Sequence, residues 1–315
     1  MPSSGRVLGL FPDGRWNAFW VDLQALAAAR VAGWANYGGD RAWISPEIDT
    51  NLAVTGDGRL EVVVPRSVDP GVYTLTWTTA DACELMTRDT VFFRRSGVTA
   101  DLSRRRFIEQ TADVPYALPE MAPGVQAVGY RLTTTLVSPD PLPEDVRPAV
   151  WSIVQVPPGT DITIPAGTAA PRTHAFFGEP RFDVSSAGEL SCTVRTTASF
   201  KLGLHAHDSR GLAIAEGTVG SDCMLVVRAF PVTDPDLCSD VPADDPDATG
   251  YVQQIYVDDG GLGGFGELEH HSPFLSERNQ FRVIDRCLTY AYSGPIESVH
   301  AVKERWITDA RSEDA

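Results

Sequence analysis

Two glutamates and a histidine alternate near the end of the chain, in the stretch GGFGELEHHSP at residues 263–273. Side chains of a strand point alternately to opposite faces, so a strand here would place Glu267, Glu269 and His271 on one face. Two carboxylates about 7 Å apart on a desolvated face raise each other's pKa, which prepares a general base near neutral pH. An exposed strand face shows the same alternation, so the stretch predicts either a reaction centre or a wet sheet surface.

A second alternating stretch, SFKLGLHAHDSRG at 199–211, predicts a strand with Lys201, His205 and His207 on its polar side. Two histidines at i and i+2 can share a metal or a substrate, and an imidazole can act as an acid near neutral pH. The metal pattern of jelly-roll enzymes requires a glutamate four or five residues later, and this chain has none there. We expect the polar side to line a cleft or to hold a structural histidine pair.

Charged and aromatic side chains also follow a Gly-Gly turn in NYGGDRAWISPEID, at residues 36–49. Asp40, Arg41 and Glu47 carry groups that bond to sugar hydroxyls, and the indole of Trp43 can stack on the apolar face of a pyranose. These residues are candidates for a sugar site. The alternative is a charged loop beside a core tryptophan.

His174, in PRTHAFFG, follows a proline-rich connection and is expected in a loop, where functional residues are common. The sequence shows no serine nucleophile elbow, no P-loop and no dinucleotide fingerprint. The run GGLGGFG at 260–266 resembles a phosphate loop, but no helix pattern follows it, so the dipole that would hold a phosphate is missing. No cofactor and no metal are therefore expected.

The chain of 315 residues is 43% hydrophobic, which is enough for a sizeable core. Acidic residues outnumber basic ones by 42 to 26, so the net charge of −16 argues against nucleic acid and anionic membranes as partners. Arg104 to Arg106 form the only dense basic run, and we expect it at a solvated edge.

The five cysteines are odd in number, widely spaced and without a C-x-x-C pair, so neither a disulfide framework nor structural zinc is expected. The start lacks the pattern of a secretory signal, and no apolar run reaches 18 residues. We expect a protein of the reducing cytoplasm. The first expected strand begins only about five residues in, which is also compatible with a missing leading segment.

Period-two alternation rich in Val, Thr, Ile and Tyr recurs along the chain between turn signals, and it predicts 14 to 16 strands. Besides the late stretch, strands are expected at 59–65, 72–79, 129–138, 151–156, 189–194, 199–207, 223–232 and 250–258. The strand at 223–232 is apolar on both faces, so it should be central and covered on each side.

One helix is expected at 22–32, capped by Asp22, and the Asp/Pro-rich segment 233–249 is expected as an excursion between strands. The sequence thus predicts an all-β protein with minimal helix, a large antiparallel β-sandwich formed by a single domain over residues 1–315.

The order of several short motifs resembles that of a known family. RVLGLF, YGGDRAWISPE, AVWSIVQVPPG and GFGELEHHSP follow one another along nearly the whole chain. This series resembles the galactose mutarotase-like, or aldose 1-epimerase-like, β-supersandwich family, in particular an uncharacterised branch with a G-G-D-(R/K)-x-W motif. The resemblance implies the supersandwich fold and a carbohydrate or sugar-like ligand.

The resemblance also implies roles for individual residues. In aldose 1-epimerases a late L-E-T-Q-like motif carries the base, and LEHHSP is similar to it, which makes Glu269 the base. The epimerases carry a histidine in a mid-chain N-H-x-Y-F motif. The nearest counterpart here is WSIVQ, which contains Gln155 and no histidine, and an amide cannot relay a proton. The acid would then be His205, His207 or His174.

Other site residues follow from the same comparison. Arg41 would stand for the epimerases' early arginine, and Glu267 and His271 would flank the base. The implied function is acid/base proton transfer on a sugar, most simply aldose 1-epimerisation without a cofactor. A lyase, a non-catalytic carbohydrate-binding protein and a metal-dependent enzyme using His205 and His207 with a late-strand ligand remain alternatives.

Overall fold

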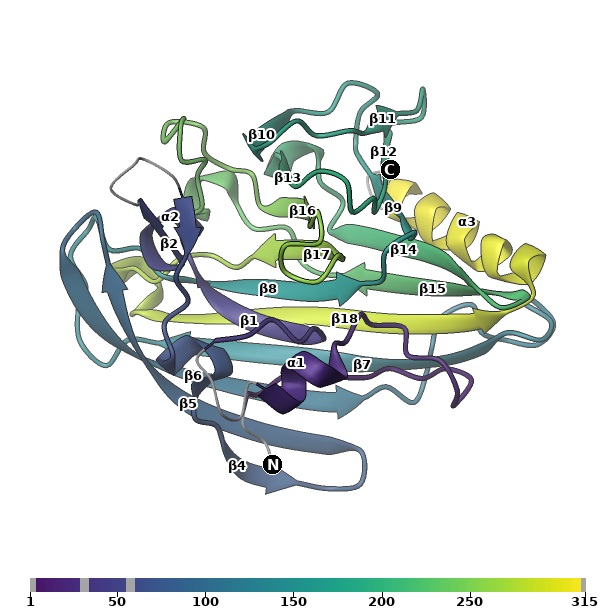
Figure 1. Ribbon diagram of the computed structural model, residues 1–315, viewed down its shortest axis with the longest axis horizontal. Coiled ribbons are helices and arrows are strands. Elements are labelled where there is room, and N and C mark those ends of the chain that lie inside the picture. Colours follow the sequence, from purple (N-terminus) through teal and green to yellow (C-terminus); the bar gives the residue numbers. More distant parts are fainter. Residues whose placement is uncertain (1–3, 29–33, 55–59, 313–315) are drawn as a thin grey trace.

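The computed structural model describes residues 4–28, 34–54 and 60–312, and it consists of two large antiparallel sheets (Figure 1). The six-stranded sheet has the order β1 (Asp40–Ser45), β8 (Ala149–Val156), β17 (Gly266–His271), β16 (Gln253–Val257), β13 (Phe200–Leu204) and β10 (Thr173–Phe177).

The ten-stranded sheet has the order β11 (Asp183–Val184), β12 (Glu189–Thr193), β9 (Asp161–Pro165), β14 (Leu212–Val219), β15 (Asp222–Ala229), β18 (Arg282–Gly294), β7 (Gln126–Val137), β6 (Val98–Gln110), β5 (Ala82–Phe93) and β4 (Thr74–Thr78). The strands β2 (Leu52–Val54) and β3 (Leu60–Val62) form a separate hairpin.

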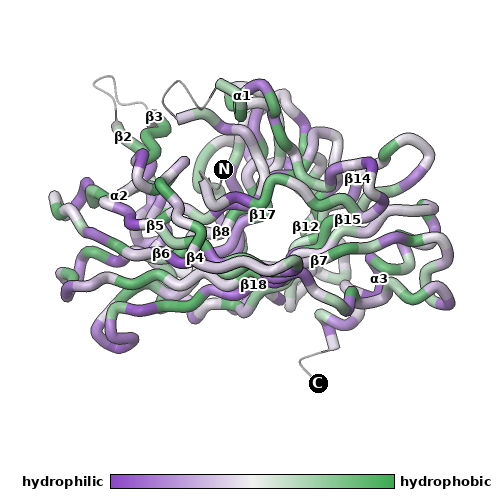
Figure 2. The backbone as a smooth tube through the Cα atoms, turned by 90° about the horizontal axis from the view of Figure 1, so that it is seen from below, coloured by the Kyte–Doolittle hydropathy of each residue, from purple (hydrophilic) through white to green (hydrophobic). Residues whose placement is uncertain are grey.

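The two sheets pack face to face, and Figure 2 shows β8 and β17 in one layer with β7 and β18 in the other. Alternate residues of both sheets meet in a shared apolar core, for example Val154 and Leu268 from the small sheet with Leu132 and Val226 from the large one. This inward and outward alternation is the period-two pattern of the sequence. The expected all-β antiparallel sandwich is confirmed.

The helices are few, and the longest was not expected from the sequence. Asp22 caps α1 (Leu23–Ala28) as predicted, because its Oδ1 accepts bonds from two backbone amides of the first turn; residues 29–32 of the expected helix lie outside the described residues. The C-terminal α3 (Ile296–Ser312) packs Val299 and Val302 on the outer face of the large sheet.

Five further short helical segments lie in connections: α2 (Glu47–Thr50), η1 (Ser67–Gly71), η2 (Ala206–Asp208), η3 (Pro235–Leu237) and η4 (Glu277–Asn279). Because α3 covers β15 from outside and the small sheet covers it from inside, the prediction of a central strand buried on both faces is confirmed. No helix among the described residues is long and apolar enough to cross a membrane.

The basic run of residues 104–106 does not form a solvated edge. On β6, Arg104 and Arg106 are fully buried and point between the sheets, while Arg105 between them is exposed. Arg104 pairs with Asp89 at 3.1 Å. The expectation was wrong for two of the three arginines because the alternation of a strand sends them to the opposite face from Arg105.

A buried ionic cluster joins the two sheets around Asp40. Its carboxylate is 2.8 Å from Arg106 and 2.6 Å from Arg228, and it accepts a 2.7 Å bond from the Tyr130 hydroxyl. Burial acts to raise the pKa of Asp40, but the two guanidinium groups outweigh it and lower the pKa. Asp40 comes from β1 of the small sheet and its partners come from the large sheet. The structure thus places Asp40, a candidate sugar ligand, between the sheets.

Asp40→Asn should destabilise the protein by about 3 kcal/mol or more, because it leaves two buried guanidinium groups without their counter-charge. Urea denaturation measures the change. Asp244→Asn, at an exposed position, is the matched control and should stay within about 0.5 kcal/mol of the parent. Equal losses in the two variants would show that the cluster does not hold the sheets together.

Candidate functional site

A cavity of about 290 Å³ lies over the face of the small sheet that points away from the large sheet. Its walls come from all six strands of that sheet, from α2, from the β2–β3 hairpin and from the loop before β17. The lining residues are Trp34, Asn36, Arg41, Trp43, Glu47, Leu52, Val62, Trp151, Phe177, Lys201, Tyr256, Leu262, Phe265, Glu267 and Glu269. Carboxylates, two cations and aromatic rings therefore meet in one enclosure.

Strand register brings the polar groups together. On β17, Glu267 and Glu269 reach the cavity, whereas His270 lies on the opposite face, stacked on Phe230 and 3.1 Å from Asp285. Tyr256 of β16 lies opposite Glu267 of β17 in the sheet. On its other side, Tyr256 lies opposite Lys201 of β13. The alternation predicted for the late strand is confirmed, and the prediction of a merely wet surface is wrong, since both glutamates are buried.

Glu269 is the most unusual carboxyl group of the cavity. Its Oε2 is 3.0 Å from the Lys201 ammonium and accepts a 2.8 Å bond from the Trp151 indole, while its Oε1 is buried and has no hydrogen-bond donor among the described residues. Burial raises the pKa of Glu269 to about 8; Lys201 opposes this shift and Glu267 adds to it. A carboxyl group with this proton affinity can take and return a proton at neutral pH.

Lys201 bridges Glu269 to a second carboxyl group, Glu47. Its ammonium is 2.7 Å from Glu47 Oε2 and lies 4.2 Å above the Trp151 ring. Burial raises the pKa of Glu47 to about 7, against the opposing charge of Lys201 and with help from Asp240 and Glu269. Burial alone would lower the pKa of Lys201, but these carboxylates raise it, so the ammonium stays charged. Near neutral pH the two glutamates therefore hold close to one proton between them.

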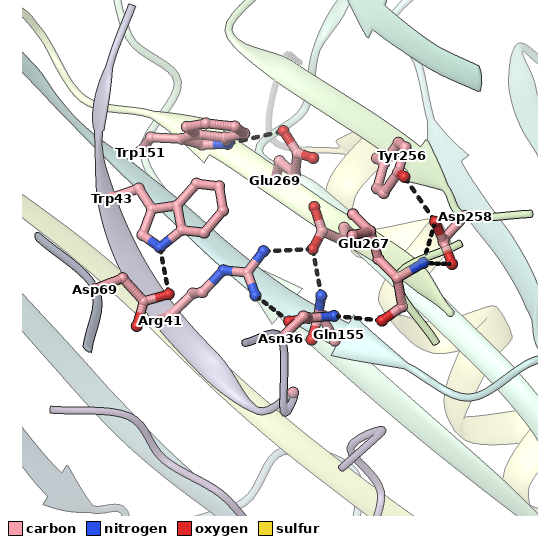
Figure 3. Close-up of polar contacts among 12 residues, drawn as sticks. Asn36, Arg41, Trp43, Asp69, Trp151, Gln155, Tyr256, Asp258, Glu267 and Glu269 are labelled. Carbon is pink, nitrogen blue, oxygen red and sulfur yellow. Dashed lines mark hydrogen bonds and ion pairs between the residues drawn. The ribbon is translucent and has the colours of Figure 1, made fainter. Parts of the chain in front are cut away.

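Glu267 is fixed by a separate group of bonds (Figure 3). Its Oε1 lies 2.8 Å from Arg41 and 2.5 Å from the Gln155 amide. Arg41 also donates to Asn36 at 2.7 Å and stacks 4.1 Å from the Trp43 ring. Gln155 thus lies beneath Glu267 and does not line the cavity. These contacts leave Glu267 positioned to accept bonds from a ligand.

One wall of the cavity is aromatic, and a buried carboxylate orients it. Trp34 and Trp43 both donate their indole N–H to Asp69, at 2.8 and 3.1 Å. The ring of Trp43 meets Trp34 and Trp151 edge to face, at centroid distances of 6.0 and 5.3 Å. The three indoles form a rigid surface against which an apolar ring face can stack.

The histidines proposed as the acid lie elsewhere. The strand expected at 199–207 ends at Leu204, so His205 caps η2 and His207 is exposed. His174 is not in a loop. It lies on β10 and packs against Tyr251. None of these three lines the cavity, so the structure does not bring them to Glu269.

His205 and His207 are also not brought together with a ligand from the late strand, so the alternative metal site does not form. His271, the remaining candidate, is buried behind Trp151, stacked on it at 5.8 Å, with Nε2 3.6 Å from Asp240. Burial lowers the pKa of His271 to about 4, so its ring is neutral at physiological pH.

Besides Asp69, sequence reasoning missed two further carboxylates that hold the site in shape. Asp240, within the excursion at 233–249, accepts bonds from the Glu47 backbone at 2.7 Å and from Gln254 at 2.9 Å. Asp258 accepts backbone bonds from the glycine-rich loop, including Gly260 and Gly264, which places Leu262 on the cavity. An aspartate in an acidic loop carries no sequence signal of its burial, whereas Asp258 before a glycine run is a recognisable loop-forming pattern.

Fold and cavity together define an antiparallel two-sheet protein with an acidic, aromatic-lined binding site on its smaller sheet. No model of a known protein family matches the chain, and no curated protein matches it in sequence.

Several solved structures do match. A putative aldose 1-epimerase from Escherichia coli K12 has 13% identity, with 81% of this chain and 84% of that chain covered and a TM-score of 0.39. A galactose mutarotase-like protein from Lactobacillus casei has 8% identity, 81% and 84% coverage and a TM-score of 0.41. The galactose 1-epimerase from Lactobacillus acidophilus has 8% identity, 89% and 86% coverage and a TM-score of 0.34. At this level of similarity, function has to be inferred from the cavity itself.

The raised pKa of Glu269 predicts a specific pH dependence of stability. The pKa of Glu269 is about 8 in the folded protein and near 4.5 in the unfolded chain. The protonated group therefore stabilises the folded state fully at low pH, and this stabilisation is lost as the pH rises from 4.5 to 8. Between pH 5 and 8 the free energy of unfolding should therefore fall by roughly 2–4 kcal/mol less in Glu269→Gln than in the parent. Urea denaturation at several pH values measures this, with Glu179→Gln, at an exposed position, as the control. Parallel curves for the parent and Glu269→Gln would contradict the prediction.

Proposed function

We propose that the protein binds a neutral sugar or sugar-like ligand in this cavity and transfers protons at its anomeric centre, as an aldose 1-epimerase does. The observation that carries the proposal is the state of Glu269. This carboxyl group is buried at the cavity with one oxygen lacking a donor, and burial raises its pKa to about 8, while Glu47, on the other side of Lys201, has a pKa raised to about 7.

The chemistry of the walls supports a sugar ligand. A pyranose has an apolar ring face that stacks on indole, and its hydroxyl groups bond to carboxylates and cations at the ring edge. The three indoles supply the first kind of surface, and Glu267, Arg41 and Lys201 supply the second. The volume of about 290 Å³ is at the lower end for ligand sites and suits a single small ring.

The charges favour a neutral ligand over a phosphorylated one. Arg41 is committed to Glu267, and Lys201 is committed to Glu47 and Glu269. The cations are therefore already matched by carboxylates, and a phosphate would enter without a free counter-charge. The net charge of −16 adds a repulsive field around the cavity.

Ring opening needs one base and one acid. Glu269 takes the proton of the anomeric hydroxyl, the bond between the anomeric carbon and the ring oxygen breaks, and that oxygen takes a proton from Glu47. The open-chain aldehyde rotates, and the reverse transfers close the ring on its other face. Lys201 contacts both glutamates, so its positive charge stabilises whichever of the two is ionised.

A non-catalytic sugar-binding protein is the second candidate. The observation that favours it is that no imidazole lines the cavity within the described ranges. In this case Glu47 would only accept hydroxyl bonds, and the ligand would leave with its anomeric configuration unchanged.

Glu269→Gln and Glu47→Gln should each lower the rate of anomeric exchange at least 100-fold, because each variant lacks one proton-transfer group. One-dimensional NMR of free and phosphorylated sugars, recorded with and without the protein, identifies the substrate and measures exchange. His207→Ala is the control and should retain full activity, since its side chain is exposed outside the cavity. Binding without exchange by the parent protein would favour the second candidate.

The rate should also have a bell-shaped pH profile. The base Glu269 must be ionised while the acid Glu47 is protonated. Because the pKa of Glu269, about 8, lies above that of Glu47, about 7, this reactive form is a minority species whose share is largest between the two values. Activity should therefore be maximal between about pH 7 and 8 and fall on both sides. A rate that is flat from pH 5 to 9 would show that these groups do not carry the proton.

A further inference from the structure

Three side chains with metal-binding atoms converge on the outer face of the large sheet, far from the cavity lining. Glu216 on β14, Cys223 on β15 and His300 on α3 place one oxygen, one sulfur and one nitrogen within 4.8 Å of one another. Within the described ranges, no other trio of His, Cys, Asp or Glu meets this condition. Glu216 and Cys223 belong to one hairpin, and folding brings His300 of α3 to them.

The spacing of sulfur and oxygen fits a tetrahedral ion. The Cys223 Sγ is 3.5 Å from Glu216 Oε1. With bonds of about 2.3 Å to sulfur and about 2.1 Å to oxygen, two atoms at this distance subtend about 105° at a zinc ion. The geometry at these two ligands therefore already matches a zinc site.

His300 can complete the site with a small movement. Its Nε2 lies 2.5 Å from the same Glu216 oxygen, so the ring would withdraw by about 1 Å to give a tetrahedral angle. The imidazole is on the surface of α3 with 52% of its side chain exposed, and nothing in the core has to rearrange for this movement.

Lys303 prepares the carboxylate for binding through one oxygen. Its ammonium is 2.8 Å from Glu216 Oε2, which leaves Oε1 to face Cys223 and His300. An outer partner that fixes the orientation of a ligand in this way is typical of metal sites.

We propose that Glu216, Cys223 and His300 bind a divalent transition metal ion, with Zn²⁺ as the best match and water as the fourth ligand. Thiolate and imidazole ligands favour zinc over magnesium and calcium, which prefer oxygen ligands. On binding, the Cys223 thiol loses its proton to solvent and forms the sulfur–metal bond. The ion would join α3 to the β14–β15 hairpin, a role separate from the proposed sugar chemistry.

The test is a titration of reduced, EDTA-treated protein with Zn²⁺ by calorimetry and with Co²⁺ by absorption spectroscopy. We expect one Zn²⁺ per chain and a thiolate-to-cobalt charge-transfer band. Cys223→Ser should abolish the band and weaken Zn²⁺ binding at least tenfold. His300→Ala, at an exposed position of α3, should weaken binding to a similar extent. Zn²⁺ should raise the melting temperature of the parent and not of the variants.

Cys83→Ser is the matched control, because Cys83 is a half-buried thiol on β5, outside the trio. This variant should bind both ions as the parent does. The proposal is overturned if the parent binds no stoichiometric Zn²⁺, or if Cys223→Ser and His300→Ala both bind it with the parent's affinity.

Discussion

The small sheet buries charged groups on both of its faces, and each of them depends on a partner supplied by another strand. On β1, Asp40 points toward the large sheet and meets Arg106 and Arg228, while its neighbour Arg41 points the other way and meets Glu267. A shift of register by one residue would exchange the two faces and leave all these charges unpaired in the interior. The ion pairs therefore specify one register, and this register assembles the cavity.

The cavity carries more carboxylate than its cations can neutralise, and its chemistry follows from this imbalance. Lys201 lies between Glu47 and Glu269, and a single ammonium cannot offset the burial of two carboxylates. One proton held between the glutamates is the least costly state, which is why the pKa values of both glutamates are raised. The Trp151 indole donates to Glu269 and so orients its carboxyl group.

Strand alternation explains most of what the sequence could predict. It correctly placed Glu267 and Glu269 on one face, because the late strand is regular and buried along its whole length. Applied to the early motif, the same rule places Asp40 and Arg41 on opposite faces of a strand. The composition of that motif alone does not distinguish the two residues. It failed at His205, because the chain leaves the strand one residue earlier and turns into η2. Long-range partners such as Asp240 are fixed only by the tertiary fold, so no local pattern could reveal them.

In the proposed reaction, Glu47 takes the place of the mid-chain histidine of the epimerase pattern. Gln155, near the expected counterpart, is bound beneath Glu267 and has no proton to relay. Glu47 enters from a different segment, and burial gives it a pKa of about 7, close to the ordinary value of an imidazole near 6.5. What an acid needs in this reaction is a proton of suitable affinity within reach of the ring oxygen, and a desolvated carboxyl group provides that affinity as well as a histidine does. Loss of the histidine therefore does not by itself imply loss of proton transfer, provided that Lys201 continues to hold Glu47 next to Glu269.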